Sequence, residues 1–98
     1  MKKLLSILFI LFSCPIIFAQ YTISGYLKDG ETGESMIGAT IIVDGTSNGT
    51  VSNVYGFFSL KVDTSDVTIV YSFVGYSPIK KTYSLTGDVR EDLELLIS

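Results

Sequence analysis

The side chains able to carry acid–base or metal chemistry in this 98-residue sequence are almost all carboxylates. The sequence holds 10 Asp and Glu residues against 7 Lys and Arg residues, and it contains no histidine. A zinc carboxypeptidase site needs histidine among its ligands, and the usual nucleophilic triads need it as the general base. The absence of histidine therefore excludes both kinds of site. The net charge of −3 also makes nucleic acid an unsuitable partner.

Two pairs of acidic residues are close enough in sequence to be candidate ligands or a catalytic pair: Glu31 with Glu34, and Asp63 with Asp66. A glycoside hydrolase needs two carboxyl groups at a controlled separation in a cleft, and calcium needs six or more oxygens around it. Both pairs lie in turn-rich segments, where Asp, Ser and Thr side chains cap backbone groups. We therefore expect solvated loop acids, with no metal, no cofactor and no enzymatic activity.

The segment GTSNGTVSNVYGFFSL at 45–60 raises a different question, because its glycines could cradle a phosphate. A phosphate loop needs its glycines to lead into a helix N-terminus, with a lysine beside the phosphates. No helical pattern follows, and Lys61 falls inside a predicted strand. The segment is therefore predicted to reverse the chain at Gly45, Asn48, Gly49 and Gly56, with Asn48-Gly49 at the centre of a type I′ turn.

The first 19 residues are typical of a secretory signal peptide. Lys2 and Lys3 precede an apolar run at 4–12, and the small Ala19 stands before Gln20. Cleavage is predicted after Ala19, which leaves one domain at 20–98. Cys14 is the only cysteine, and its apolar surroundings argue against lipid attachment. The domain then contains no cysteine and no disulfide.

Beyond Gln20, apolar residues alternate with polar ones at the period of half-buried β-strands, and no helical period is present. The segment 67–76 is apolar on both faces, as a central strand would be. The pattern predicts an all-β, seven-stranded Greek-key sandwich of the immunoglobulin-like kind. Its expected strands are 21–28, 39–44, 49–53, 58–62, 67–76, 79–85 and 91–97.

Three aromatic residues, Tyr55, Phe57 and Tyr76, are expected to point away from the core. Two interpretations stay open, since such rings either cover the ends of the sheets or bind a sugar or a protein partner. The last expected strand, 91–97, lies at the end of the sequence. We expect it to leave a sheet edge that could pair with another polypeptide.

The spacing of small and apolar residues through the middle of the sequence resembles the carboxypeptidase regulatory-like domain. It is similar in particular to the domain at the mature N-terminus of starch-utilisation-type TonB-dependent outer-membrane transporters. The resemblance covers 20–96 and implies a non-catalytic, transthyretin-like sandwich in the periplasm, ahead of a TonB box and plug. The residues that carry it are Gly25, Asp29, Gly33, Gly38-Ala39-Thr40, Val43, Gly45-Thr46, Gly49-Thr50, Asn53, Gly56, Phe58, Leu60 and SFVGY at 72–76.

Two hypotheses about function follow. The first is an exported module of the outer-membrane uptake apparatus of a Gram-negative bacterium, acting by contact with a protein partner in the periplasm or at the outer membrane. The alternative is a stand-alone secreted module that binds carbohydrate or another surface. The sequence stops where a TonB box, plug and barrel would begin. It is therefore expected to be an isolated domain, a partner acting in trans, or the front of a longer reading frame.

Overall fold

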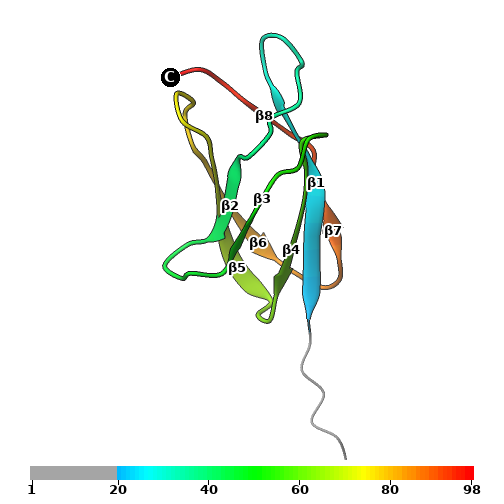
Figure 1. The fold of residues 1–98 in the computed structure, drawn as a ribbon. Helices are drawn as coiled ribbons and strands as arrows, with labels where there is room; N and C mark the ends of the chain where they lie inside the picture. Colours follow the sequence, from blue (N-terminus) through cyan, green and yellow to red (C-terminus); the bar gives the residue numbers. More distant parts are fainter. Residues whose placement is uncertain (1–19) are drawn as a thin grey trace, which may run out of the picture.

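The computed structural model describes residues 20–98, which form a sandwich of two β-sheets (Figure 1). The predicted signal peptide at 1–19, with Cys14, lies outside the described residues. Within 20–98 there is no helix with the length and apolar character needed to cross a membrane. The strands are β1 (Tyr21–Asp29), β2 (Thr40–Val43), β3 (Gly49–Val51), β4 (Phe57–Val62), β5 (Asp66–Ser72), β6 (Ile79–Ser84), β7 (Val89–Arg90) and β8 (Leu93–Leu95).

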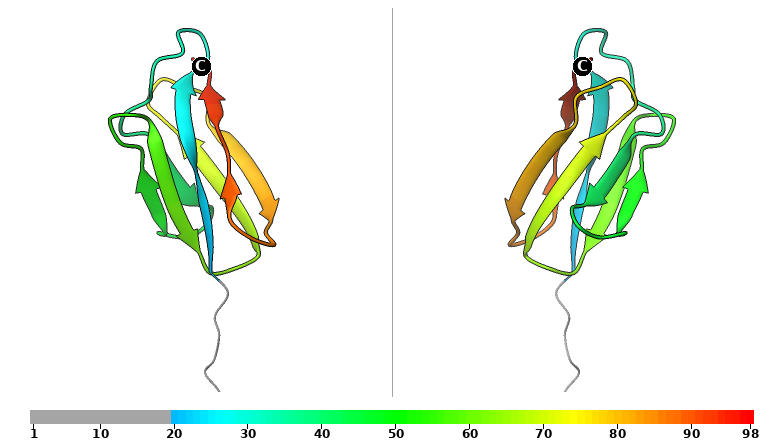
Figure 2. Two further views of the ribbon diagram at one scale, coloured as in Figure 1. Left: turned by 90° about the vertical axis from the view of Figure 1, so that its right-hand side faces the viewer. Right: turned by 90° about the vertical axis from the view of Figure 1, so that its left-hand side faces the viewer.

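One sheet has β1 at its centre, with β4 antiparallel on one side and β7 and β8 parallel on the other. The second sheet has the order β3-β2-β5-β6, and all of its pairs are antiparallel. The two sheets face each other across one core, as the two side views in Figure 2 show. The predicted all-β sandwich is confirmed, and β5 lies inside its sheet as expected.

The predicted number of strands and several strand boundaries differ from the structure. Eight strands are described instead of seven, because the short strand β7 precedes the expected strand at 91–97, of which only β8 is formed. The expected strand at 67–76 stops at Ser72. The chain turns there through Gly75, whose φ is 88°, and Tyr76 then pairs with Ile97 instead of extending β5.

The core is built by the inward-facing residues of both sheets. Alternate residues of β4 and β5 are buried, as the period of two requires. The hydroxyl groups of Tyr71 and Tyr83 lie 2.7 Å apart and form a hydrogen bond inside this core. Burial, together with this hydrogen bond, raises the pKa of Tyr71, so the pair stays neutral. The largest fully buried side chains are Tyr71, Phe58, Ile23, Leu27, Ile41, Ile69 and Leu95.

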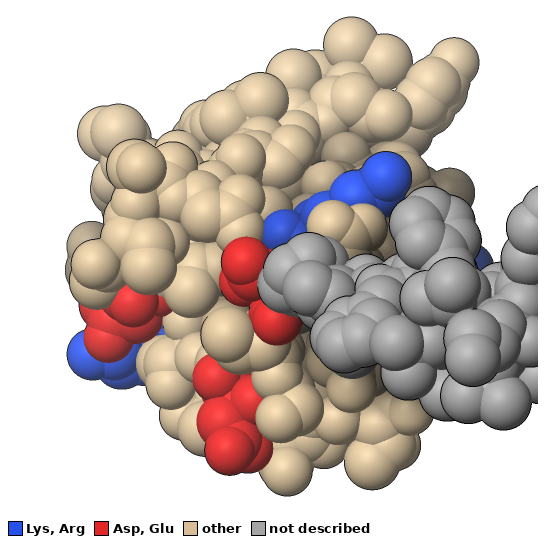
Figure 3. Space-filling view, turned by 90° about the horizontal axis from the view of Figure 1, so that it is seen from below, with Lys and Arg blue, Asp and Glu red and all other residues tan. Residues whose placement is uncertain are grey.

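The two ends of the sandwich differ in character. The loops at 44–48, 63–65 and 85–88 close the end where β1 begins, and acidic side chains gather there in the view from below (Figure 3). The loops at 30–39 and 73–78 and the last residues of the chain lie at the other end. That end carries most of the exposed large apolar side chains, including Ile37, Val74, Leu96 and Ile97.

The glycine-rich segment at 45–60 forms reversals without the predicted type I′ turn. The loop between β2 and β3 has a positive φ only at Gly45, and Gly49 already pairs with Ile42. Thr46 organises this loop instead, because its hydroxyl donates to the Val43 carbonyl and accepts the Asn48 N–H. The type I′ assignment of Asn48-Gly49 was therefore wrong.

Two glycines in this segment provide a matched test of steric space. Gly45 and Gly56 both have a φ of 76°. A methyl group at Gly45 would meet nothing within 4 Å, whereas at Gly56 it would lie 2.5 Å from the Leu27 carbonyl oxygen. We expect Gly45→Ala to lower the free energy of unfolding by about 1–2 kcal/mol through backbone strain alone. Gly56→Ala should cost about 1–3 kcal/mol more through overpacking.

The measurement is urea unfolding of both variants, followed by circular dichroism at neutral pH. Equal losses at the two positions would show that the contact between Gly56 and Leu27 is not tight.

Candidate interaction site

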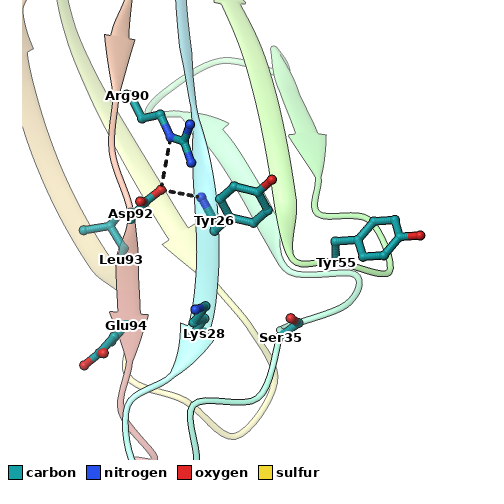
Figure 4. Close-up of a pocket in the computed structure, with 8 residues that line it drawn as sticks. All are labelled: Tyr26, Lys28, Ser35, Tyr55, Arg90, Asp92, Leu93 and Glu94. Carbon is teal, nitrogen blue, oxygen red and sulfur yellow. Dashed lines mark hydrogen bonds and ion pairs between the residues drawn. The ribbon is translucent and has the colours of Figure 1, made fainter.

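An open groove of about 840 Å³ lies on the outer face of the sheet that contains β1 (Figure 4). Ile23 and Leu27 of β1 point into the core, so the alternating residues Tyr26 and Lys28 point outward into the groove. Two residues of loops, Ser35 and Tyr55, also line the groove. The lining residues are Tyr26, Lys28, Ser35, Tyr55, Arg90, Asp92, Leu93 and Glu94.

Three side chains in contact, Phe57, Tyr26 and Arg90, form a row across this face from β4 to β7. The rings of Phe57 and Tyr26, which are cross-strand partners, meet edge to face with centroids 5.3 Å apart. On the other side of Tyr26, the guanidinium carbon of Arg90 lies 5.2 Å from the ring centroid. Contacts of these two kinds stabilise by about 0.5–1.5 kcal/mol each. The row is therefore held in place by its own contacts.

Two aspartates fix the strand that carries Arg90. The Asp88 carboxylate accepts the Thr22 N–H at 2.9 Å, and the Asp92 carboxylate accepts the Tyr26 N–H at 3.0 Å. Asp92 also lies 3.5 Å from Nε of Arg90. Side-chain oxygens thus replace backbone carbonyls at both ends of β7.

The close approach of the chain at Glu91 explains why β7 and β8 are separate. The Glu91 N–H donates to the Ser24 carbonyl at 2.7 Å, and the Glu91 carbonyl lies against Gly25, where any side chain would collide with it. Tyr26, Arg90 and Asp92 were not predicted as site residues from the sequence. The available signal was the pair of aspartates spaced four residues apart around Val89-Arg90.

The charges in the groove balance, since Lys28 and Arg90 stand beside Asp92 and Glu94. Asp92 is engaged through one carboxylate oxygen by the Tyr26 N–H and by Arg90. Between residues 20 and 98 there is no cluster of three or more His, Cys, Asp or Glu residues that could hold a metal ion. The four loop acids considered above, Glu31, Glu34, Asp63 and Asp66, are exposed. The groove therefore presents aromatic and charged side chains on an open surface.

The structure brings together two of the three aromatic residues predicted to make partner contacts. Tyr55 lines the groove and is 70% exposed, and Phe57 packs against Tyr26. Tyr76 does not point outward as expected. It lies half-buried in the loop between β5 and β6, with its ring 5.6 Å from that of Phe73. Its hydroxyl donates to the Asp29 carboxylate.

The predicted turn residues have separate structural roles. Gly45 and Gly56 adopt positive φ in the loops that follow β2 and precede β4. Gly49 begins β3. Asn48 donates from its side-chain amide to the Lys61 carbonyl at 3.0 Å, which joins its loop to β4.

Asp29 anchors the loop that follows β1. Its carboxylate accepts the Tyr76 hydroxyl and the backbone N–H groups of Glu31 and Thr32, the latter two at 2.8 and 3.1 Å. These hydrogen bonds, the one from Tyr76 first, hold the pKa of Asp29 below its ordinary value. The same carboxylate raises the pKa of Tyr76. The contact joins β1 to the loop at 73–78 of the opposite sheet.

This contact predicts a defined dependence of stability on pH. The pKa of Asp29 is lowered in the folded state, so its stabilisation is fully present above the unfolded value of 3.8. It is lost as the pH falls through the lower folded value, because the unfolded chain binds the proton first. We expect the difference in unfolding free energy between the wild-type chain and Asp29→Asn to be largest at neutral pH and to shrink below pH 4.

Urea unfolding at a series of pH values between neutrality and about pH 2 measures this difference. Tyr76→Phe should lower stability at neutral pH and reduce the same pH dependence. Glu31→Gln removes a neighbouring exposed carboxylate and serves as the control. A difference that stays constant with pH would contradict the role assigned to Asp29.

Comparison with known protein families gives a match over nearly all of the described chain. Residues 23–98 match the CarboxypepD_reg-like domain. The TonB-dependent receptor SusC of Bacteroides thetaiotaomicron is 39% identical over 79 residues, which are 79% of this chain and 8% of the receptor. The TonB-dependent receptor P39 of Formosa agariphila is 31% identical over 97 residues, which are 95% of this chain and 9% of the receptor. The chain thus spans less than a tenth of the length of these relatives.

Solved structures with a similar fold include chains from two mutants of a type II cohesin–X–dockerin complex from Acetivibrio cellulolyticus. The C-terminal interface mutant superposes with a TM-score of 0.64 at 23% identity, over 79% of this chain and 56% of the other. The N-terminal interface mutant gives a TM-score of 0.62 at 22% identity over the same shares. At these identities the likeness supports the β-sandwich fold alone.

Proposed function

Because the chain belongs to the CarboxypepD_reg-like domain family, we propose that it is a non-catalytic module of a TonB-dependent receptor and acts by protein contact. The observation that carries this proposal is the family match over 23–98, together with receptor relatives that are 30–39% identical to the chain. The module would be either part of such a receptor or an isolated relative of its domain. Nutrient uptake would be carried out by the whole receptor and not by this module alone.

The groove on the outer face of the β1 sheet is the proposed contact surface. The row of Phe57, Tyr26 and Arg90 is held rigid by its own contacts, which reduces the entropy that a partner must remove on binding. Exposed aromatic and arginine side chains are the types that dominate protein interfaces. Tyr55 adds a largely free ring at one side of the groove.

The proposed location is the periplasm or the outer membrane of a Gram-negative bacterium. Residues 1–19 would direct export and be removed after Ala19, and 20–98 would be the mature domain. The receptor relatives support a place in the cell envelope. The sandwich contains no cysteine between 20 and 98, so its folding does not depend on the redox state of that compartment.

A domain exchange in the Bacteroides receptor tests this function. The 79-residue segment that matches this chain is deleted, or is replaced by the corresponding part of this chain. We expect the deletion to slow growth that depends on the receptor, and the exchange to restore it. Arg90→Ala within the exchanged domain should reduce the rescue, whereas Lys61→Ala, on an exposed residue outside the groove, should not.

Normal growth after the deletion would contradict a role in uptake. Failure of the exchanged domain to restore growth, with the chimeric receptor present at normal levels in the outer membrane, would contradict the assignment of this chain to that role.

A second candidate function is binding of a neutral carbohydrate, and the groove itself favours it. Its charges balance, and charged and hydroxyl groups stand beside the exposed ring of Tyr55. Titration of residues 20–98 with neutral oligosaccharides, followed by tyrosine fluorescence, would then show saturable binding. Tyr55→Ala should weaken binding at least about tenfold, which corresponds to about 1.4 kcal/mol. Tyr21→Ala, outside the groove, is the control, and the absence of binding would remove this candidate.

A further inference from the structure

The backbone of β6 forms an unpaired edge of the second sheet. β6 pairs with β5 on one side only, and it is the outermost strand of its sheet in both views of Figure 2. The Leu85 N–H donates to the Ser65 carbonyl at 2.7 Å, so Leu85 and Ser65 form a hydrogen-bonded pair. This pair sets which residues of β6 bond to β5 and which do not. Hydrogen-bonded pairs alternate with non-bonded pairs in an antiparallel ladder. The N–H and C=O groups of Lys80, Thr82 and Ser84 therefore point away from β5.

The side chains of the ladder agree with this alternation. Thr68 and Thr82 are direct partners, and their hydroxyl oxygens lie 2.9 Å apart. Such close side-chain contact is typical of a non-hydrogen-bonded pair. Thr82 thus lies between Lys80 and Ser84, and the N–H and C=O groups of all three residues are free of β5.

At the other long edge, that of β4, two asparagines bond outward backbone groups of Phe57 and Lys61, on either side of Ser59. Asn53 donates its N–H to the Phe57 carbonyl at 2.9 Å and accepts the Phe57 N–H on its side chain at 3.0 Å. Asn48 donates to the Lys61 carbonyl at 3.0 Å. Within 20–98, no comparable hydrogen bond reaches the outward backbone groups of β6. The remaining edge strands, β3, β7 and β8, have at most three residues each.

The charge on β6 restricts what can pair with its edge. Lys80 and Lys81 both lie on this strand, and their side chains are 63% and 44% exposed. A second copy paired through the same edge would bring lysines close to lysines, and like charges across a strand pair are destabilising. An acidic strand would place carboxylates there instead. Both lysines already form ion pairs within the chain, Lys80 with Asp44 next to the end of β2 and Lys81 with Glu91. Because their side chains stay 63% and 44% exposed, carboxylates of an added strand could share these ammonium groups.

We propose that the edge of β6 binds an extended acidic segment of another polypeptide, which adds as a strand beside Lys80, Thr82 and Ser84. The inference rests on the proposed function in so far as both require the chain to act by protein contact. It names a second surface, on the sheet opposite the groove. Backbone hydrogen bonds would supply affinity, and the two lysines would select acidic partners.

Hydrogen exchange and NMR titration of residues 20–98, which contain the core cluster described above, test the proposal. In the free chain the amides of Lys80, Thr82 and Ser84 should exchange fast, whereas those of Lys81 and Tyr83 should be protected. The probe is a blocked peptide of alternating glutamate and valine. We expect saturable shifts and about tenfold slower exchange at the three outward amides. A peptide of alternating lysine and valine should leave them unchanged.

Two proline variants separate strand addition from nonspecific binding. Thr82→Pro removes an outward N–H without breaking the ladder to β5, and it should abolish binding of the acidic peptide. Ser59→Pro is the matched control, because Ser59 also points outward, on the edge of β4. It should leave binding intact, and the shifts of core amides report whether each variant is folded.

Three results would overturn the proposal: no shift at the outward amides with millimolar acidic peptide, equal binding to Thr82→Pro, or equal binding of the lysine peptide. Protection of the same amides in the free chain, with dimers in sedimentation, would show that a second copy occupies the edge. Each result is independent of the domain exchange, so the receptor role can stand while strand addition fails.

Discussion

The rest of the structure depends on the backbone pairing of β1 with strands on both of its edges. One of its edges pairs antiparallel with β4, and the other pairs parallel with β7 and β8. Its inner face supplies Ile23 and Leu27 to the core, and its outer face presents Tyr26 and Lys28 to the groove. Because the first and last strands are parallel, the chain enters at one end of the sandwich and leaves at the other (Figure 1).

The edges of the two sheets are protected in three different ways. Asparagine side chains bond outward backbone groups of β4, and aspartate carboxylates replace backbone partners around the short β7. β6 carries lysines and keeps its outward backbone groups free. Unpaired edges promote aggregation unless they are short, covered or charged. A charged edge differs from a covered one because it still admits a partner of opposite charge.

Several features of the site could not be read from local sequence. The period of two predicted that Tyr55, Phe57 and Tyr76 all point outward, but Tyr76 is held half-buried by Asp29, which is 47 positions away in the sequence. The Asn-Gly pair at 48–49 favours a type I′ turn in isolation, but the Asn48 side-chain amide donates a hydrogen bond to the Lys61 carbonyl of β4. Arg90 entered the site only because β7 lies beside β1, a parallel pairing between residues about 66 positions apart. Each error comes from a contact between distant segments.

The sequence by itself determined the all-β class, the single core and the absence of histidine chemistry, because side-chain alternation and composition are local properties. It also carried the family resemblance, since glycine and apolar spacing reflects turns and inward positions along one chain. Only the tertiary structure decided which strand edges stay free, which aspartates replace backbone partners and which aromatic rings share a face. These depend on the order in which strands pair, and pairing order is set by packing across the whole core, which no short segment of sequence encodes.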